Sequence, residues 1–248
     1  MQRRNFIKGG LLASSLSLKS SSSALAPIEF TPITAEERKM RVAKAQKLMA
    51  EKQIQSIILD AGINMNYFTG ISWHPSERSM LAIIPVKGDP FFICPAFEED
   101  RFLEMAPAGT KVQTWEEDEN PFALTSNLLN KLGFQLGQIG IDEFCRFFIF
   151  DGLRKSDANF QFISADPITI PCRIIKSAAE IALMQKANDA TVKAIQAGIA
   201  ALTLGCTPRQ ISQKIAQAQA CDATCPVSTS IFLRIVAEYA WEEHNERN

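Results

Sequence analysis

The sequence has 248 residues, of which 26 are Lys or Arg and 27 are Asp or Glu, and 46% are hydrophobic. This composition is sufficient for a substantial buried core, and it excludes a disordered tail and a strongly basic protein that binds nucleic acid. No apolar run reaches the roughly 18 to 20 residues that a helix needs to cross a bilayer, so we expect no stable membrane insertion.

The first 26 residues have the pattern of an export signal. They contain four basic residues and no acidic one, together with a weakly apolar stretch and a serine run. Residues 3–8 resemble a twin-arginine signal, and Ala24-Leu25-Ala26 is typical of a cleavage site. We predict a signal peptide over residues 1–26 and export to the periplasm by the twin-arginine route. A lipid-surface helix and a disordered basic tail are the alternatives, and Pro27 leaves the cleavage position open.

Residues 34–94 show a helix followed by strand patterns. Thr34 and Glu37 form a capping box, which predicts a helix that continues to about Gln53. A buried strand is expected at 56–60, then a loop or short helix through Gly70. Two apolar runs, at 80–86 and 91–94, are joined by turn residues, so we predict a hairpin and a mixed sheet.

The alternation of expected helices and strands continues to about residue 170. Strands are expected at 111–115, 138–142 and 160–164, with helical segments from Ala96, from Pro121 and around Phe147. The fold class is therefore α/β, with a domain at 34–170 in which helices flank a mixed sheet.

Helix follows helix after Pro171. Ser177 and Glu180 form a second capping box, and Thr207 with Gln210 marks another helix start. We expect a domain boundary near Pro171, two helices of a second domain at 171–220, and a tail of different character at 221–248.

The densest group of polar and aromatic residues lies on the loop after Gly70. It contains Trp73, His74 and Arg78, which are candidates for a structural or ligand-rim role because binding residues concentrate on loops held by a scaffold. Hydrolysis with His74 as a base for Ser72 or Ser76 is one alternative, although closeness in sequence does not establish catalytic geometry. A plain surface loop is the other.

The sequence contains no strong candidate for a metal-binding site. The acidic runs at 98–100 and 116–119 could bind a hard cation, but solvated acidic faces and a helix N-terminus beginning at Asn120-Pro121 explain them more simply. Cys221 and Cys225 lack a second pair of soft ligands, so a closed zinc site is not expected. The six cysteines are too few and too irregular for a disulfide scaffold, and their pairing stays open.

Two stretches resemble the creatinase, prolidase and aminopeptidase P group of metallohydrolases, whose catalytic domain has the "pita-bread" fold. Residues 62–71, followed by 75–78 and a strand to Pro85, look like the creatinase-type N-terminal domain. Residues 173–187 are similar to the segment that enters the pita-bread domain. The resemblance covers about residues 34 to 220 and is nearest to Xaa-Pro aminopeptidases and dipeptidases.

This resemblance implies the chemistry of the intact relatives. They bind two divalent ions, expected to be manganese, cobalt or zinc, through two Asp, one His and two Glu, and cleave proline-containing peptides with a metal-activated water. In the family these ligands follow the segment matched by residues 173–187, and nothing beyond Ala220 resembles them. We therefore expect no catalytic residue, metal ligand or cofactor in this chain, which we interpret as truncated by a frameshift or stop and inactive.

The same resemblance implies two roles for the N-terminal domain. It would help subunits associate, giving a homo-oligomer, and it would shape access to the active site, with Trp73, His74 and Arg78 at the substrate rim. The alternative is a non-enzymatic module for oligomerisation or peptide binding, in which the tail covers the apolar faces of the last helices.

Overall fold

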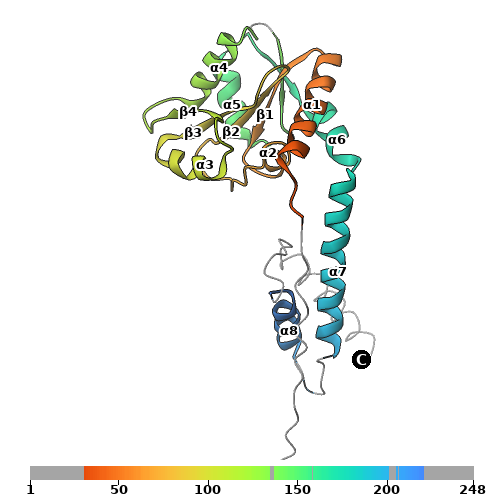
Figure 1. Cartoon of the computed structure of the whole chain (residues 1–248). Coiled ribbons are helices and arrows are strands. Elements are labelled where there is room, and N and C mark those ends of the chain that lie inside the picture. The colour runs from red at the N-terminus through yellow and green to blue at the C-terminus, as the bar shows by residue number, and fades with distance from the viewer. Residues whose placement is uncertain (1–30, 135–136, 158, 201–204, 206, 221–248) are drawn as a thin grey trace, which may run out of the picture. The chain divides into compact units, whose positions relative to one another are not determined.

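A computed structural model describes residues 31–134, 137–157, 159–200, 205 and 207–220 (Figure 1). The expected signal peptide at 1–26 and tail at 221–248 lie outside the described residues. The described residues divide into two compact units, one spanning Thr31–Met184 and one from Gln185 onward.

Six strands form one mixed sheet in the order β4-β3-β2-β1-β5-β6. Strand β2 is antiparallel to both of its neighbours, and the other pairs are parallel. The predicted hairpin and the mixed character of the sheet are therefore confirmed. The strands are β1 (Ile54–Asp60), β2 (Leu81–Pro85), β3 (Phe91–Pro95), β4 (Lys111–Trp115), β5 (Gln138–Ile141) and β6 (Gln161–Ser164).

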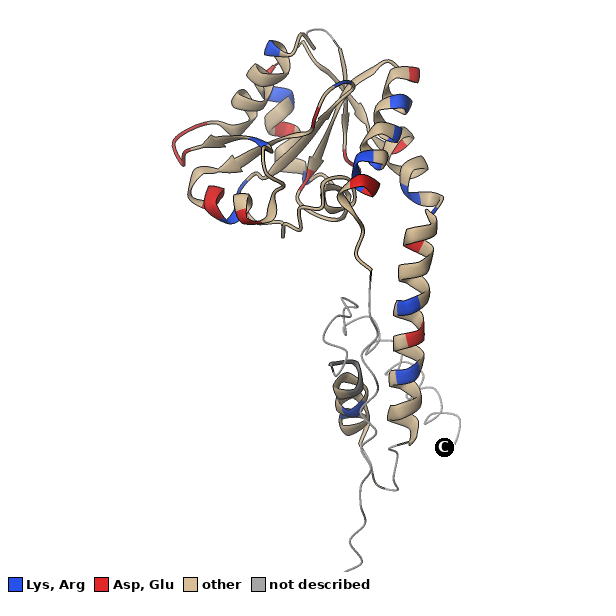
Figure 2. Cartoon of the chain, viewed as in Figure 1, with Lys and Arg blue, Asp and Glu red and all other residues tan. Residues whose placement is uncertain are grey.

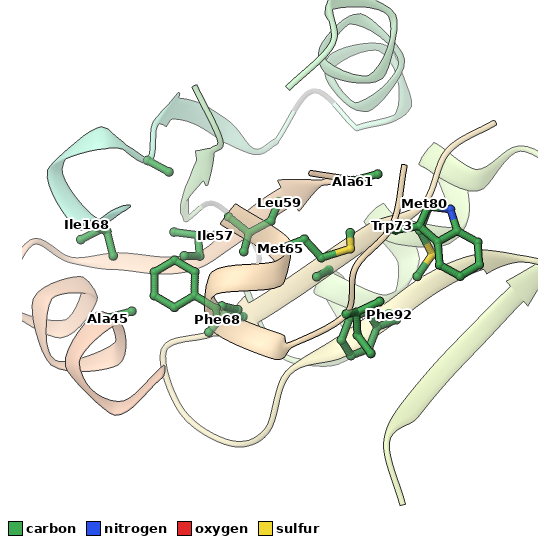
Figure 3. Close-up of a cluster of buried hydrophobic side chains, with 14 of the residues drawn as sticks. Ala45, Ile57, Leu59, Ala61, Met65, Phe68, Trp73, Met80, Phe92 and Ile168 are labelled. Atoms are coloured by element: carbon green, nitrogen blue, oxygen red, sulfur yellow. The ribbon is translucent and has the colours of Figure 1, made fainter. Parts of the chain in front are cut away.

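Helices cover both faces of this sheet, which confirms the α/β class (Figure 1). Successive side chains of a strand point to opposite faces, so Ile57 and Leu59 enter one apolar core and Ile58 enters the other. Figure 3 shows the first core, where Phe68 and Met65 of a short helix lie with Ile57 and Leu59. The first core is covered by α1 (Ala35–Glu51), α2 (Ile63–Thr69), α3 (Glu99–Met105, after the 3-10 turn η1 at Ala96–Glu98) and α6 (Asp166–Ile174), and the second by α4 (Pro121–Lys131) and α5 (Phe147–Ser156).

Local capping signals fix the helix starts. The Thr34 hydroxyl accepts a hydrogen bond from the Glu37 N–H at 3.1 Å, and the Asn120 side chain accepts from the N–H groups of Phe122 and Ala123. These oxygens satisfy backbone donors that have no partner within the helix. At the other end of α2, Gly70 has φ +81°, a left-handed conformation that glycine adopts without strain.

Helix α6 was not predicted from the sequence. It contains Pro171 and begins with Asp166-Pro167, and proline is favourable only in the first turn. Ile168 and Cys172 face the first core, which compensates for the missing hydrogen bond at Pro171. Tertiary packing therefore overrides the local signal for a break.

Two further helices follow, α7 (Ala178–Ala200) and α8 (Pro208–Ala220). Ser177 and Glu180 form the predicted reciprocal capping box, with distances of 3.2 and 2.7 Å. In the second unit α7 packs closely on α8, because a Cβ at Gly198 would lie 2.3 Å from Cγ1 of Ile215. A pita-bread domain is not evident in the described part of the chain. Within that part, no helix combines the length and apolar character of a membrane span.

Three cysteines of the first unit are free thiols, and their reactivity can be predicted. Burial raises the pKa of Cys94 and Cys145 to about 12. Since the thiolate is the reactive form, we expect alkylation at pH 8 to be at least ~1000-fold slower than for an ordinary thiol. Iodoacetamide labelling followed by mass spectrometry should leave both residues unmodified in the folded chain and modified in guanidinium. Rapid labelling without denaturant would show that these two thiols are accessible in the folded chain, contrary to the prediction.

Candidate functional site

Several buried polar residues of the first unit lie at one edge of the sheet. Strands β1, β3, β4, β5 and β6 run in the same direction, so their carboxyl ends meet at this edge, and antiparallel β2 begins there. The loop of residues 71–80 leads into β2, and it therefore lies beside the carboxyl ends of its neighbours. In open α/β sheets this edge is where ligands usually bind.

An ion pair between buried Asp60 and partly exposed Arg146 occupies the junction between β1 and α5. Asp60, the last residue of β1, is 2% exposed and accepts two hydrogen bonds from Arg146, from Nε at 2.7 Å and from Nη2 at 2.8 Å. The backbone N–H groups of Ala61 and Arg146 also donate to this carboxylate. Such a bidentate pair has fixed geometry as well as favourable charge, and it raises the pKa of Arg146.

The same arginine holds the loop of residues 71–80. Its Nη1 donates a hydrogen bond to the Ser76 carbonyl, and the Trp115 indole N–H donates to the Ser79 carbonyl at 3.1 Å. Arg78 pairs with Glu117, 2.6 Å away, and with the adjacent Glu77. The loop is thus fastened to β1, β4 and α5 at several points.

A second network lies beside the first. The Asn64 amide, 1% exposed, donates to Asp142 Oδ1 at 2.6 Å, and its oxygen accepts from Arg173 Nη1 at 2.7 Å. Burial raises the pKa of Asp142, while the hydrogen bonds from Asn64 and the Phe144 N–H act in the opposite direction. Asn64 therefore connects the carboxyl end of β5 to the end of α6.

The three residues predicted to form a substrate rim occupy different environments. Trp73 is 5% exposed, belongs to the first core, and has the Arg101 guanidinium 4.7 Å from its ring centroid. His74 is exposed, and Arg78 is held by its two glutamates above the Phe97 ring. The structure thus places His74 and Arg78 on one loop at the surface and Trp73 beneath it. Their role at a rim stays a prediction.

The acidic runs do not converge on a cation site. Glu98 pairs with Arg101, Glu117 pairs with Arg78, and the Glu119 carboxylate accepts from the Glu116 N–H. Across the residues that the structure describes, no group of three or more His, Cys, Asp or Glu side chains is placed to hold a metal ion.

The arrangement at this edge is suited to positioning rather than to acid–base chemistry. At the carboxyl ends of β1 and β5, the polar groups are already bound to one another or to the backbone, namely Asp60, Arg146, Asn64 and Asp142. None of these four residues was predicted from the sequence as a site residue. Asp60 and Asp142 each follow an apolar strand run, and the convergence of parallel strand ends is the signal that could have found them.

Comparison with known proteins agrees with this architecture. The model of the creatinase/prolidase N-terminal domain matches residues 41–175, which include every strand of the sheet. A prolidase from Thermococcus sibiricus shares the fold with a TM-score of 0.64 and 22% identity, over 73% of this chain and 49% of that structure.

Two curated relatives are peptidases by name. An uncharacterized peptidase of Schizosaccharomyces pombe is 32% identical over 201 residues, which are 75% of this chain and 43% of the relative. The putative dipeptidase YkvY of Bacillus subtilis is 24% identical over 71% of this chain and 48% of its own length. The chain thus spans about half the length of these relatives.

Proposed function

The chain belongs to the family of creatinase/prolidase N-terminal domains, and on this premise we propose that it supplies the non-catalytic amino-terminal domain of a prolidase-type peptidase. The observation that carries the proposal is the coincidence of the family match, 41–175, with the complete six-stranded domain. The proposed substrates of the whole enzyme are peptides cleaved next to proline, as in Xaa-Pro aminopeptidases and dipeptidases.

The described residues do not fit a two-metal centre. Such a centre needs several carboxylate or imidazole ligands around two adjacent ions. The best-placed carboxylates here, Asp60 and Asp142, already bind Arg146 and Asn64, and no described group of three ligands exists. We therefore assign no catalytic step to these residues, and the manganese, cobalt or zinc of the proposed enzyme would be held elsewhere.

The role that this domain plays in the proposed enzyme is to border the path of the peptide. Exposed His74 and partly exposed Arg78 lie on a loop that Arg146 and Trp115 fasten to the sheet, so the loop presents them in a fixed arrangement. A fixed rim can discriminate between peptides without the entropic cost of ordering a mobile loop.

Association with another protein surface is the second role that an observation favours. Phe144 and Phe147 are 60% and 76% exposed, and Ile174 and Ile175 at the end of α6 are 68% and 75% exposed. Contiguous exposed apolar surface is typical of interaction sites, and each of these two pairs of neighbouring residues could contribute to such a surface. They support contact with the remainder of the proposed peptidase or with a second copy of the chain.

Export is the remaining element of the proposal. The basic opening segment with Arg3-Arg4 supports twin-arginine transport to the periplasm. Because that route carries folded proteins, the domain would assemble before transport.

A peptidase assay tests the proposal. The purified full chain is incubated with Ala-Pro and Leu-Pro dipeptides and with Ala-Pro-Ala, in the presence of Mn²⁺, Co²⁺ or Zn²⁺, with an active prolidase as positive control. We expect no release of proline or of the amino-terminal residue, and less than one equivalent of tightly bound metal. Two equivalents of metal accompanied by turnover would show that the chain is itself the enzyme.

A further inference from the structure

A groove separates α1 from the turns at one side of the sheet, away from the Asp60 and Asp142 networks. Its volume is about 500 Å³. The apolar walls include Val42, Phe68 and Phe92, and the polar rim comes from α1, from the turn at 88–90 and from the loop at 107–111. This is the size and the mixture of apolar walls with a few polar groups that small-molecule sites have.

The charges that line this groove are mostly positive. Arg38, Lys39 and Lys111 border it, against a single acidic residue, Asp89. Among the described side chains, none of the three basic residues takes part in an ion pair. Figure 2 shows in blue the basic residues that recur along α1.

Arg38 is held in place although it lacks a partner. Its Nε is buried without a hydrogen bond, and a Cβ at position 70 would lie only 2.6 Å from that atom. The guanidinium therefore packs against Gly70, where any larger residue would displace it. Because none of the described carboxylates pairs with this guanidinium, its positive charge is left to attract an anion in the groove.

We propose that this groove binds a small organic carboxylate with an apolar body. The guanidinium of Arg38 matches a carboxylate in shape and charge, Lys39 and Lys111 add favourable potential, and the apolar walls take the body of the ligand. Residues 1–30 of the same chain carry four basic residues and one acidic residue, Glu29, so this segment as a whole does not complement a positive groove. This site is separate from the role proposed above.

Calorimetric titration of the full chain tests the ligand class. The probes are N-acetyl-L-leucine, its uncharged amide and inorganic phosphate. We expect the carboxylate to bind at least tenfold more tightly than the amide or phosphate. Equal binding of the amide or phosphate, or no binding of the carboxylate, would overturn the proposal.

Three variants locate the site. Arg38→Gln should weaken binding of N-acetyl-L-leucine at least tenfold, whereas Lys47→Gln removes a charge from an exposed position of α1 outside the groove and should leave binding unchanged. If Arg38→Gln fails to fold, the exposed pair Lys39→Gln and Lys111→Gln should still weaken binding at least threefold. Binding that survives these changes would place the ligand elsewhere. Peptidase activity does not enter any readout, so the two proposals fail independently.

Discussion

The Arg146→Ala variant is expected to have a free energy of unfolding about 3 to 5 kcal/mol below that of the parent chain. The reason is the carboxylate that remains. Asp60 is 2% exposed, and without Arg146 it keeps only the N–H groups of Ala61 and of residue 146 as hydrogen-bond donors. A typical domain has about 5 to 15 kcal/mol of stability in total, so this loss would bring the first unit close to unfolding at 37 °C.

Urea unfolding of the full chain, followed by tryptophan fluorescence, measures this effect. Arg154→Ala is the matched control, because Arg154 lies on α5, which Arg146 caps, and its ion pair among the described residues is one surface pair with Asp151, worth at most about 1 kcal/mol. Combining Arg146→Ala with Asp60→Asn should recover part of the loss, since the unpaired buried charge is then absent. Equal losses for Arg146→Ala and Arg154→Ala would show that the pair does not stabilise the domain.

The same variant also separates anchoring of the loop from global stability. Arg146 donates to the Ser76 carbonyl, so hydrogen exchange of the amides in 71–79 should accelerate even where the rest of the sheet stays protected. Unchanged hydrogen exchange in this loop would mean that Trp115 and Glu117 hold the loop without a contribution from Arg146.

Local signals were sufficient to predict most elements of the fold. Capping residues such as Thr34 and Asn120 act within three positions of themselves, and strands such as Lys111–Trp115 stand out because apolar and polar residues alternate. The missed helix α6 contains Pro171, and its stability comes from packing against α1, which the local pattern does not report.

The hydrogen-bonded polar residues at the carboxyl ends of β1 and β5 could not be predicted in the same way, because the partners are distant in sequence. Asp60 and Arg146 are separated by 86 positions, and Asn64 and Arg173 by 109. Their pairing depends on β5 lying next to β1, and the sequence pattern identified both strands without giving their order. The burial of Trp73 is likewise set by tertiary packing, since the residue stands on a polar loop in the sequence while its ring lies in the first core.

The second large effect is expected from Asn64→Leu, which should lower the free energy of unfolding at pH 7 by about 2 to 4 kcal/mol. Leucine fills a similar volume but leaves Asp142 without its shortest hydrogen bond, and it removes the amide oxygen that accepts from Arg173, which then keeps Glu143 at 3.9 Å. Asn127→Leu, at an exposed position of α4, is the matched control and should change stability by less than about 0.5 kcal/mol.

The cost of Asn64→Leu should also depend on pH, and the sign follows from Asp142. The folded-state pKa of Asp142 already lies above its unfolded value, so the folded state binds more protons between the two values and stability falls as pH rises through that interval. Removing the Asn64 hydrogen bond raises the folded-state pKa further. The loss caused by Asn64→Leu should therefore be smallest below the ordinary carboxyl pKa and grow towards neutral pH.

A double-mutant comparison isolates the contribution of Asp142 to this pH dependence. Asp142→Asn keeps an acceptor oxygen for Asn64 but cannot ionise, so in that background the cost of Asn64→Leu should be the same at pH 4 and pH 7. In the parent background the cost should be greater at pH 7 than at pH 4. The measurement is urea unfolding of the four chains at both pH values. A cost that rises equally with pH in both backgrounds would assign the pH dependence to a group other than Asp142, and Asn64 would then act through Arg173 and packing alone.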